Sequence, residues 1–359
     1  MRFFGEDLTL FRTASGAYGL VDDRCPHRCM SLEYGIPEET GLRCAYHGWL
    51  FDAKGRCLEQ PFEDLTHPDG RYKDEVRIKA YPVQALGGLV FAYFGPAPAP
   101  LLPRWDVLVR DDLDRAVEMH MLPCNWLQCM DNSADPVHFE FLHAGFGNYQ
   151  LKKLGRPPAM NPARHVKIAF DLFKYGMIKR RLLEGEPEDS DDWAVGHPIL
   201  FPNTLAQGAA QAPSLQIRVP VDDTHTLHFM YRTNPRKPGA PPKPFAAKRS
   251  NQFMEGGKIV ADAVLLHDMI AWVAQGPISD RTREHLATSD RGIVLYHKLL
   301  MEQMDRVERG EEPMAIIRER AENEPMIVIE RERGTLGAFE SRYDNYYEKI
   351  EAHADVKGA

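Results

Sequence analysis

Residues 25–49 read CPHRCMSLEYGIPEETGLRCAYHGW, and two short segments within this stretch decide how the first part of the chain folds. The first segment offers one thiolate and one imidazole, from Cys25 and His27. The second offers the same pair, from Cys44 and His47, after sixteen intervening residues. Two thiolates and two imidazoles brought together by a pair of loops predict a metal centre in this part of the chain.

A Rieske [2Fe–2S] cluster needs this donor set, since two cysteines bind one of its irons and two histidines bind the other. Neutral imidazoles replace thiolates, so the cluster is less negative and its potential rises to roughly −150 to +300 mV. A tetrahedral Cys2His2 zinc site is the alternative, but zinc ligand pairs usually stand further apart than Cys25 and His27. We therefore predict that a [2Fe–2S] cluster is bound by Cys25, His27, Cys44 and His47. The other cysteines are expected to be small packed side chains: Cys29, Cys57, Cys124 and Cys129.

The chain has 359 residues, of which 43% are hydrophobic, and this is enough for two or three domains with buried cores. Its 44 basic and 52 acidic residues give a net charge of −8 without a long basic run, so no nucleic-acid partner is expected. The first residues lack a signal-peptide pattern, and the most apolar stretch, residues 87–103, is interrupted by Gly and Pro and is too short to cross a membrane. Six cysteines are too few for a disulfide scaffold. We expect a cytoplasmic protein.

Short strands and turns fill the first hundred or so residues. Leu8–Arg12 and Tyr18–Val21 flank a Ser-Gly turn and predict a β-hairpin, and residues 87–94 predict a buried strand. A Pro-rich run over residues 96–103 is typical of a linker. The sequence therefore predicts an α+β protein, with an all-β domain over residues 1–105 and a larger domain that contains helices over residues 106–359.

The second domain shows both strand and helix patterns. Leu215–Val221 and Leu227–Tyr231 predict two adjacent strands, the first with one buried face because its apolar residues alternate with others. Three basic residues, 179–181, are expected in a solvated turn or on a partner-binding surface. Helices are predicted over residues 125–131, 259–272, 292–307 and 340–352.

Two histidines five residues apart, His138 and His143, suggest a second metal site. Two imidazoles and one carboxylate on one face of Fe(II) leave positions open for O2 and substrate. On an ideal α-helix, however, residues five apart point roughly 140° away from each other. The two histidines can therefore share a metal ion only where the helix ends or is distorted between them.

The carboxylate ligand has to come from later in the chain. Asp268 lies among apolar residues, where a carboxylate is costly unless it is paired or bound to a metal. Three other candidates, Asp262, Asp280 and Asp290, have polar neighbours and are expected to be solvated or to cap helices. We predict Asp268 as the ligand, and a partly exposed helix aspartate is the alternative.

Asp135 precedes His138 by three residues, a spacing that makes them neighbours on a helix. Its carboxylate can accept a hydrogen bond from the far nitrogen of a metal-bound imidazole, a contact that commonly fixes the orientation of the ring. The alternative is that Asp135 only caps a helix that begins at Pro136.

These motifs together are similar to those of one family. The chain resembles the α subunits of Rieske non-haem iron ring-hydroxylating oxygenases, most closely the phthalate-dioxygenase-like branch, which includes O-demethylases. The resemblance covers nearly the whole chain. It rests on CPHR (25–28), CAYHGW (44–49), GGLVFAYFGP (87–96), NWLQCMDNSADPVHFEFLH (125–143) and QGPISDRTREHLATSD (275–290).

The resemblance implies a helix-grip catalytic domain, in which an antiparallel sheet curves around a helix. It also implies head-to-tail homotrimers in which the cluster of one subunit serves the iron of its neighbour. Asp135 matches the acid that joins the two metal centres across the subunit contact. Family members usually carry more residues before the segment that begins here at Met1. The positions that match the ligands of the cluster and of a mononuclear Fe(II) are Cys25, His27, Cys44 and His47, and His138, His143 and Asp268.

The reaction of this family uses O2, two electrons and a reductase. No Gly-rich dinucleotide motif follows a predicted strand, so an NAD(P)H-dependent reductase is expected to be a separate protein. Arg218 and Arg232 occupy even-numbered positions of the two predicted strands and suggest a clamp for a substrate carboxylate, with structural or surface arginines as the alternative. We expect hydroxylation or O-demethylation of a small aromatic acid. The other possibilities are a quaternary-ammonium demethylase and a Rieske electron carrier without oxygenase activity.

Overall fold

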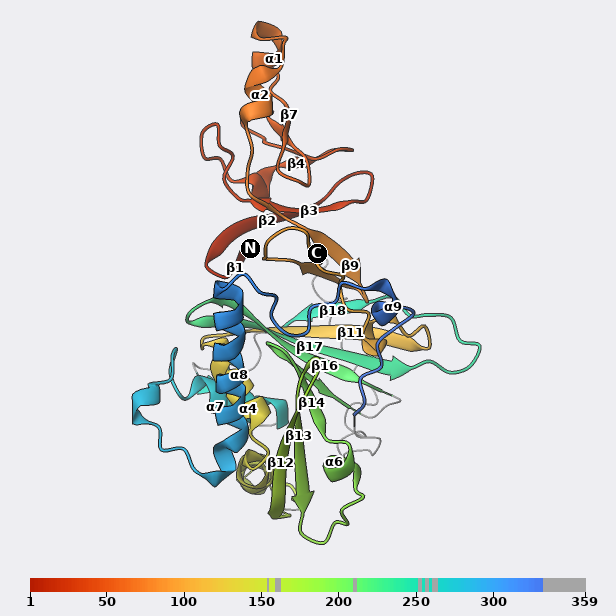
Figure 1. The fold of residues 1–359 in the computed structure, drawn as a ribbon, viewed down its shortest axis with the longest axis vertical. Helices are drawn as coiled ribbons and strands as arrows, with labels where there is room; N and C mark the ends of the chain where they lie inside the picture. Colours follow the sequence, from red (N-terminus) through yellow and green to blue (C-terminus); the bar gives the residue numbers. More distant parts are fainter. Residues whose placement is uncertain are drawn as a thin grey trace. The chain divides into compact units, whose positions relative to one another are not determined.

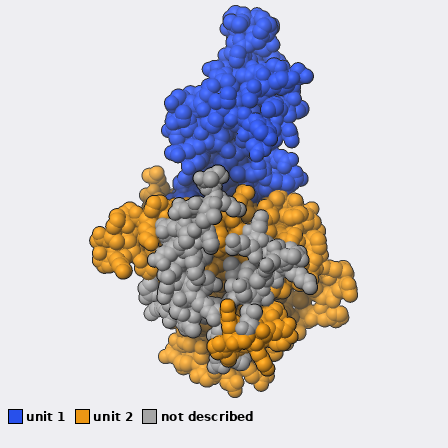
Figure 2. All heavy atoms as spheres, turned by 180° about the vertical axis from the view of Figure 1, so that it is seen from behind, with its two compact units in different colours: residues 1–102 blue, residues 103–359 orange. Residues whose placement is uncertain are grey.

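The computed structural model describes residues 1–153, 155–158, 163–208, 212–250, 254–255, 258–259 and 264–331. It divides into two compact units, Met1–Leu102 and Pro103–Ala359, which are coloured separately in Figure 2. The division falls within the Pro-rich run that predicted a linker. Among the residues described, none of the helices combines the length and the apolarity that a membrane-spanning segment requires.

The first unit consists of short antiparallel strands and a few helical turns (Figure 1). One four-stranded sheet has the order β1-β2-β3-β8 and contains the predicted hairpin, with Leu8 opposite Asp22. A second sheet has the order β4-β5-β6-β7, and β9 pairs with β10. The strands are β1 Arg2–Phe3, β2 Glu6–Arg12, β3 Tyr18–Asp22, β4 Ile36–Pro37, β5 Leu42–Arg43, β6 Leu50–Phe51, β7 Cys57–Glu59, β8 Ala80–Tyr81, β9 Val83–Leu86 and β10 Leu89–Ala92. The helical turns are η1 Leu32–Tyr34, α1 Glu63–Thr66 and α2 Arg71–Glu75.

The strand predicted over residues 87–94 is shorter than expected. Gly87 and Gly88 have φ angles of 59° and 84° and form a two-residue turn, so only Leu89–Ala92 belongs to β10. Two-residue hairpin turns often need positive φ at both central positions, which glycine adopts without strain. The residues of β10 are half-buried or exposed, so the predicted burial of this strand is wrong.

The second unit is built on a sheet of eight strands in the order β12-β13-β14-β15-β16-β17-β11-β18. Neighbouring strands are antiparallel, except that β11 and β18 run parallel. Strands β16 and β17 contain the two predicted strands and are joined where Asp222 lies opposite His225. The strands are β11 Leu113–Leu122, β12 His165–Phe173, β13 Gly176–Leu183, β14 His197–Leu200, β15 Thr204–Gln207, β16 Ser214–Asp222, β17 His225–Pro235 and β18 Ala246–Arg249, and β19 Met254–Glu255 pairs separately with β20 Lys258–Ile259.

Helices cover one face of this sheet. Met130 and Ala134 of α4 and Tyr296 of α8 pack against Met177, Ile199 and Leu205 of the strands. Helices α4 and α8 correspond to two predicted helices, and α7 begins later than predicted because residues 258–259 lie in β20. The helix predicted over residues 340–352 lies outside the described residues. The helices are α3 Asp106–Val109, α4 Trp126–Ala134, η2 Phe139–Phe146, α5 Gly147–Lys153, α6 Asp191–Ala194, α7 Val264–Val273, η3 Arg281–Arg283, η4 Thr288–Asp290, α8 Arg291–Glu308 and α9 Arg320–Asn323.

Two expectations about exposure are wrong. Residues 179–181 lie in the middle of β13, and Lys179 and Arg181 are buried on the face that the helices cover. Strand β16 was expected to have one buried face, yet Gln216 and Arg218 on its even-numbered face are buried as well. Both errors have one cause. Helices pack on the sheet face that carries these polar side chains, and neither a run of basic residues nor alternation along a strand shows which face a helix covers.

Candidate metal centres

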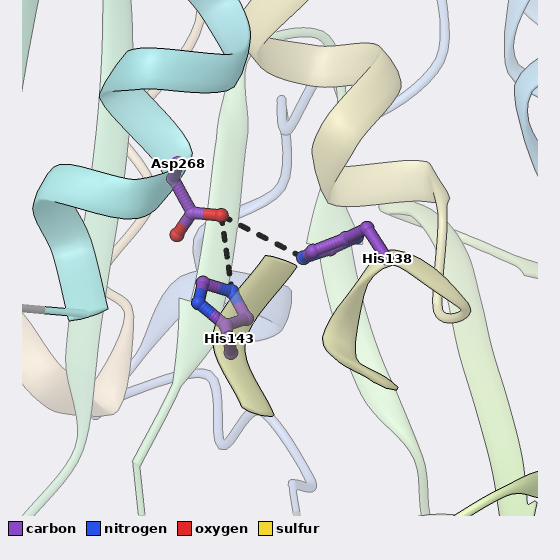
Figure 3. Close-up of side chains that lie close together, drawn as sticks. All are labelled: His138, His143 and Asp268. Atoms are coloured by element: carbon purple, nitrogen blue, oxygen red, sulfur yellow. Dashed lines mark ion pairs between the residues drawn. The ribbon is translucent and has the colours of Figure 1, made fainter. Parts of the chain in front are cut away.

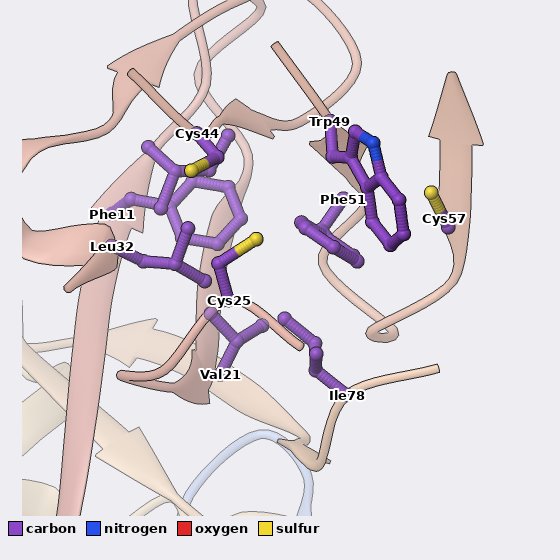
Figure 4. Close-up of a cluster of buried hydrophobic side chains, with 10 residues drawn as sticks. Phe11, Val21, Cys25, Leu32, Cys44, Trp49, Phe51, Cys57 and Ile78 are labelled. Carbon is purple, nitrogen blue, oxygen red and sulfur yellow. The ribbon is translucent and has the colours of Figure 1, made fainter. Parts of the chain in front are cut away.

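In the two cysteine–histidine segments of the first unit, the cysteines are buried and the histidines are exposed. Cys25 and Cys44 lie in the apolar core, at 1% and 3% exposure (Figure 4), whereas His27 and His47 are exposed. The imidazole rings of His27 and His47 lie 4.4 Å apart between centroids, and the indole of Trp49 stacks on His27 at 4.6 Å. Burial raises the pKa of the Cys25 thiol to about 12, and the neighbouring Cys44 adds to this rise. Two inner thiols and two outer imidazoles fit a two-iron cluster in which each iron takes one kind of ligand.

The loops that carry these donors have the same hydrogen-bond pattern. The N–H of Cys29 donates to the carbonyl of Cys25 at 2.9 Å, and the N–H of Gly48 donates to the carbonyl of Cys44 at 3.0 Å. Cys29 and Gly48 each stand four residues after the cysteine to which they donate. Both have positive φ, 56° and 77°. The side chain of Cys29 is directed to solvent, so the expectation that it is packed is wrong. Cys57, Cys124 and Cys129 are buried as expected.

The helix that carries the two later histidines is distorted, as the spacing requires. Helix α4 ends at Ala134, and the chain then forms a π-helix, η2, over Phe139–Phe146, with His138 directly before it. A π-helix is closed by i→i+5 hydrogen bonds, so residues five apart come to the same side. The distortion predicted from the histidine spacing is confirmed, and it brings the rings of His138 and His143 to 5.1 Å between centroids.

Asp268 on α7 lies between these two histidines (Figure 3). Its Oδ1 is 3.1 Å from Nε2 of His143 and 3.6 Å from Nε2 of His138. Nitrogen and oxygen donors bind a first-row ion such as zinc at about 2.0–2.2 Å, so two donors at a right angle lie about 3 Å apart. All three donor atoms lie within 4.8 Å of one another, which is the spacing that one metal ion requires.

The chemistry of this triad also fits a divalent cation. Oδ1 of Asp268 is buried and receives no well-formed hydrogen bond from the described residues. Burial raises the pKa of Asp268, but His143, His138 and Arg218 together lower it more, and the net pKa is below the usual value. A buried carboxylate facing two imidazole nitrogens, without a proton donor aligned to it, is costly unless a cation lies among them. Two imidazoles and one carboxylate are the donor set of many non-haem Fe(II) sites.

Asp135 uses its two oxygens differently. Oδ1 accepts a hydrogen bond from the N–H of Val137 at 2.7 Å, and Oδ2 lies 3.5 Å from Nδ1 of His138. Burial raises the pKa of Asp135, but His138, the N–H of Val137 and the charge of Lys179 together lower it more, so the carboxyl has a pKa below its usual value. The contact with His138 therefore has a geometric basis. The alternative, a cap on a helix that begins at Pro136, is wrong: Asp135 is the C-cap residue of α4, His138 is the N-cap residue of η2, and the contact with Val137 belongs to the turn between the two helices.

The other carboxylates considered as ligands make local contacts. Asp280 accepts hydrogen bonds from the N–H and hydroxyl of Thr282, at 3.2 and 2.6 Å. Asp290 accepts one from the N–H of Ala287 at 2.6 Å. These contacts agree with the expected capping roles. Asp262 lies outside the described residues.

Arg218 and Arg232 lie on the same face of the sheet as the triad, but in different surroundings. Arg218 is 1% exposed, donates to the carbonyl and Oε1 of Gln216 at 3.1 and 2.7 Å, and lies 5.5 Å above the ring of Trp272. Burial lowers its pKa to about 10, and Asp268 is among the groups that oppose this shift. Arg232 is half-buried and takes part in other interactions. Only Arg218 is fully enclosed.

Sequence analysis missed three side chains near these groups. Trp272 follows Asp268 by one helical turn, and His228 lies opposite Arg218 in the sheet, with its ring 5.3 Å from that of Trp272. His267 stacks on His143 at 5.9 Å, and a Cβ on Gly147 would lie 2.7 Å from its ring. The i+4 spacing of Asp268 and Trp272 was a usable signal. The placement of His228 and His267 depends on contacts between distant segments.

Comparison with known proteins finds a Rieske domain and relatives that are oxygenase subunits. A family model described as the Rieske [2Fe-2S] domain matches residues 1–82. The oxygenase subunit of 5,5'-dehydrodivanillate O-demethylase from Sphingobium sp. (strain NBRC 103272 / SYK-6) is 42% identical over 342 residues, which are 92% of this chain and 78% of that protein. Phenoxybenzoate dioxygenase subunit alpha from Ectopseudomonas oleovorans is 35% identical over 341 residues, 88% of this chain and 78% of that protein.

Solved structures share the same fold at low sequence identity. NdmA of Pseudomonas putida CBB5 matches with a TM-score of 0.62 and 18% identity, covering 86% of this chain and 84% of that one. Dicamba monooxygenase bound to dicamba matches with a TM-score of 0.55 and 15% identity, covering 86% and 93%. These proteins therefore share the fold of this chain.

Proposed function

This chain belongs to the Rieske non-haem iron oxygenases as an oxygenase component, and from this premise we propose that it inserts oxygen from O2 into a carboxylated, methoxylated aromatic compound and thereby removes the methyl group. The observation that carries the proposal is the convergence of His138, His143 and Asp268 in a chain that also has a Rieske domain. O-demethylation is favoured over plain hydroxylation because the 42% identical relative is an O-demethylase subunit. An electron carrier is not favoured, since that relative matches across both units.

Each metal group would have its own residues. Cys25, Cys44, His27 and His47 would hold the [2Fe–2S] cluster, and the triad would hold Fe(II). When bound, the cluster carries single electrons and the mononuclear iron activates O2. Asp268 would contribute a negative charge that balances the cation. Asp135 would hold the Nδ1 proton of His138 and so direct Nε2 toward the metal position.

Electrons must come from another protein. The chain has no Gly-rich dinucleotide motif, so we assign NAD(P)H oxidation to a separate reductase. We further propose a head-to-tail homotrimer, in which Asp135 of one subunit contacts a cluster histidine of the next. Light scattering of the purified protein would measure the number of chains directly, and a monomer that is fully active would contradict this assembly.

The substrate carboxylate is assigned to the surroundings of Arg218. Nε of Arg218, Nδ1 of His228 and Nε1 of Trp272 are buried and have no hydrogen-bond partner among the described residues. Arg218 forms no ion pair with a carboxylate of the described chain, although a buried cation is costly without an anion. A substrate carboxylate bound beside Arg218 would accept hydrogen bonds from these nitrogens and would pair with the buried guanidinium. A quaternary-ammonium substrate is disfavoured, because a buried guanidinium repels a cation.

The reaction is tested with a panel of methoxylated and unsubstituted aromatic acids, supplied with O2, NADH and a reductase of this family. We expect formaldehyde and the matching phenol from methoxylated acids, in equal amounts. Release of a cis-diol or a ring-hydroxylated product without formaldehyde would replace O-demethylation by hydroxylation and leave the oxygenase assignment intact.

Arg218→Met is expected to raise KM for the carboxylated substrate about 10- to 100-fold, because a hydrogen bond to a charged group contributes about 1.5–3 kcal/mol. The KM for the methyl ester of the same substrate should change little. Arg180→Met is the matched control, since Arg180 lies on β13 and pairs with Asp171 at a partly exposed position. Equal effects of Arg218→Met on acid and ester would show that Arg218 does not bind the carboxylate.

The purified protein is expected to be brown and to give the EPR spectrum of a Rieske centre on reduction. His47→Cys replaces a neutral ligand by an anionic one, so the potential should fall, by roughly a few hundred mV if it approaches that of an all-cysteine cluster. His67→Cys is a control at an exposed histidine outside the cluster loops. A colourless protein that contains zinc would end the cluster assignment.

A further inference from the structure

Lys179 of β13 is buried beneath the segment that carries Asp135 and His138. It is 7% exposed, and its Nζ donates a hydrogen bond to the backbone carbonyl of Asp135 at 3.4 Å. No carboxylate of the described residues forms an ion pair with it, and no other hydrogen bond of its ammonium group is present there. Burial, followed by the charge of Arg181, lowers the pKa of Lys179 to about 8. A buried ammonium group without a carboxylate partner lowers the stability of a folded protein.

The charged groups that face Lys179 show what its ammonium serves. They are Arg181 on its own strand, Asp192 on α6, Asp135 after α4, and Asp268 on α7. Asp192 is already paired with Arg181 at 2.6 Å and with His197 at 3.2 Å. The two acids of the metal site remain as partners for the charge of Lys179, and its hydrogen bond goes to the backbone carbonyl of one of them, Asp135.

We propose that Lys179 is a positioning residue of the mononuclear metal site: its ammonium anchors the main chain of Asp135 and, through Asp135, fixes the imidazole of His138. The inference rests on the proposed function, because it requires a metal ion at the triad. Lys179 touches Asp135, and Asp135 in turn lies 3.5 Å from His138, so the three residues form a continuous line toward the metal position.

The local structure explains why an anchor is needed at this point. Asp135 lies in the break between the end of α4 at Ala134 and the π-helix that begins at Phe139. Regular helix hydrogen bonds are interrupted there, and the orientation of His138 depends on a few side-chain contacts. The hydrogen bond from Lys179 connects the backbone at this break to strand β13. Without it, His138 would be held less firmly, and metal binding would weaken.

The test uses Co2+ as the probe, titrated by its visible absorption into full-length protein that retains its cluster after chelation has emptied the mononuclear site. Lys179→Met keeps the length of the side chain and removes the charge. We expect the Kd for Co2+ to rise about tenfold or more, as is typical when a residue that supports a metal ligand is lost. The unfolding temperature should stay the same or rise, because an unpaired buried charge is removed.

Two further variants complete the experiment. Lys179→Arg restores a cation and should recover most of the Co2+ affinity, whereas a residue needed only for packing would be matched better by Met than by Arg. Lys167→Met is the control on the neighbouring strand β12, where Lys167 pairs with Glu188 at an exposed position. It should bind Co2+ like the wild type.

Different results separate this inference from the proposed function. If the wild type binds Co2+ and His143→Ala does not, the metal site stands, and unchanged affinity in Lys179→Met overturns the role of Lys179 alone. If wild type and His143→Ala bind Co2+ equally, the metal site and the role of Lys179 both fail. Loss of folding in Lys179→Met together with Lys179→Gln would show a structural role and would also overturn the proposal.

Discussion

Asp268→Ala is expected to abolish product formation while leaving the visible spectrum of the cluster unchanged. Asp268 supplies the only carboxylate of the triad that the described residues form, and its Oδ1 faces both imidazoles. Without it, two neutral histidines remain, and they bind a divalent cation much more weakly. Iron analysis should fall from about three to about two irons per chain, since a [2Fe–2S] cluster holds two.

Asp290→Ala is the matched control for this experiment. Asp290 accepts a hydrogen bond from the N–H of Ala287 at the start of η4, so its loss should cost some stability but no iron. The assignment of Asp268 fails if Asp290→Ala loses the third iron while Asp268→Ala keeps it. Asp268→Glu is a milder variant. Its longer side chain still offers a carboxylate, so it is expected to retain iron but to place the ion differently and to have lower activity.

Asp135→Asn is expected to fold, to bind both metal groups and to accept electrons at its cluster, yet to fail in reoxidising that cluster when O2 and substrate are added. Asparagine keeps an oxygen that can accept the hydrogen bond from the N–H of Val137, so the turn after α4 is preserved. It lacks the charge of the oxygen that faces Nδ1 of His138. Loss of a partner of a metal ligand costs up to about 100-fold, so single-turnover reoxidation should slow by at least that much if Asp135 also joins the two centres.

The measurement is stopped-flow absorption of the reduced cluster, with iron content determined on the same sample. Wild-type reoxidation in Asp135→Asn at full metal content would leave Asp135 only its hydrogen bond to Val137 in the turn after α4. Asp131→Asn is a demanding control on the preceding helix α4, because Asp131 pairs with His297 at 2.6 Å and with Arg281 at 2.7 Å. It should affect stability more than reoxidation.

Local sequence patterns determined the metal-binding chemistry. The Cys25–His27 and Cys44–His47 spacing predicted the Rieske domain, because the ligands are contributed by two short loops close together in the chain. The five-residue spacing of the histidines predicted a distorted helix, because an α-helix cannot place both on one side. The π-helix over Phe139–Phe146 is that distortion. The sequence also marked Asp268, since an acid among apolar residues needs a partner.

Only the tertiary structure decided what surrounds the triad. Lys179 was expected in a solvated turn or on a partner-binding surface, and Arg218 lies on the strand face that alternation assigned to solvent, yet both are buried. Trp272 and His228 meet Arg218 through contacts between α7, β16 and β17. Alternation along a strand tells which residues share a face, but whether that face meets water or a helix depends on segments far away in the chain. The candidate ligands could therefore be proposed from local sequence, whereas the charged side chains around them became visible only once the helices were packed on the sheet.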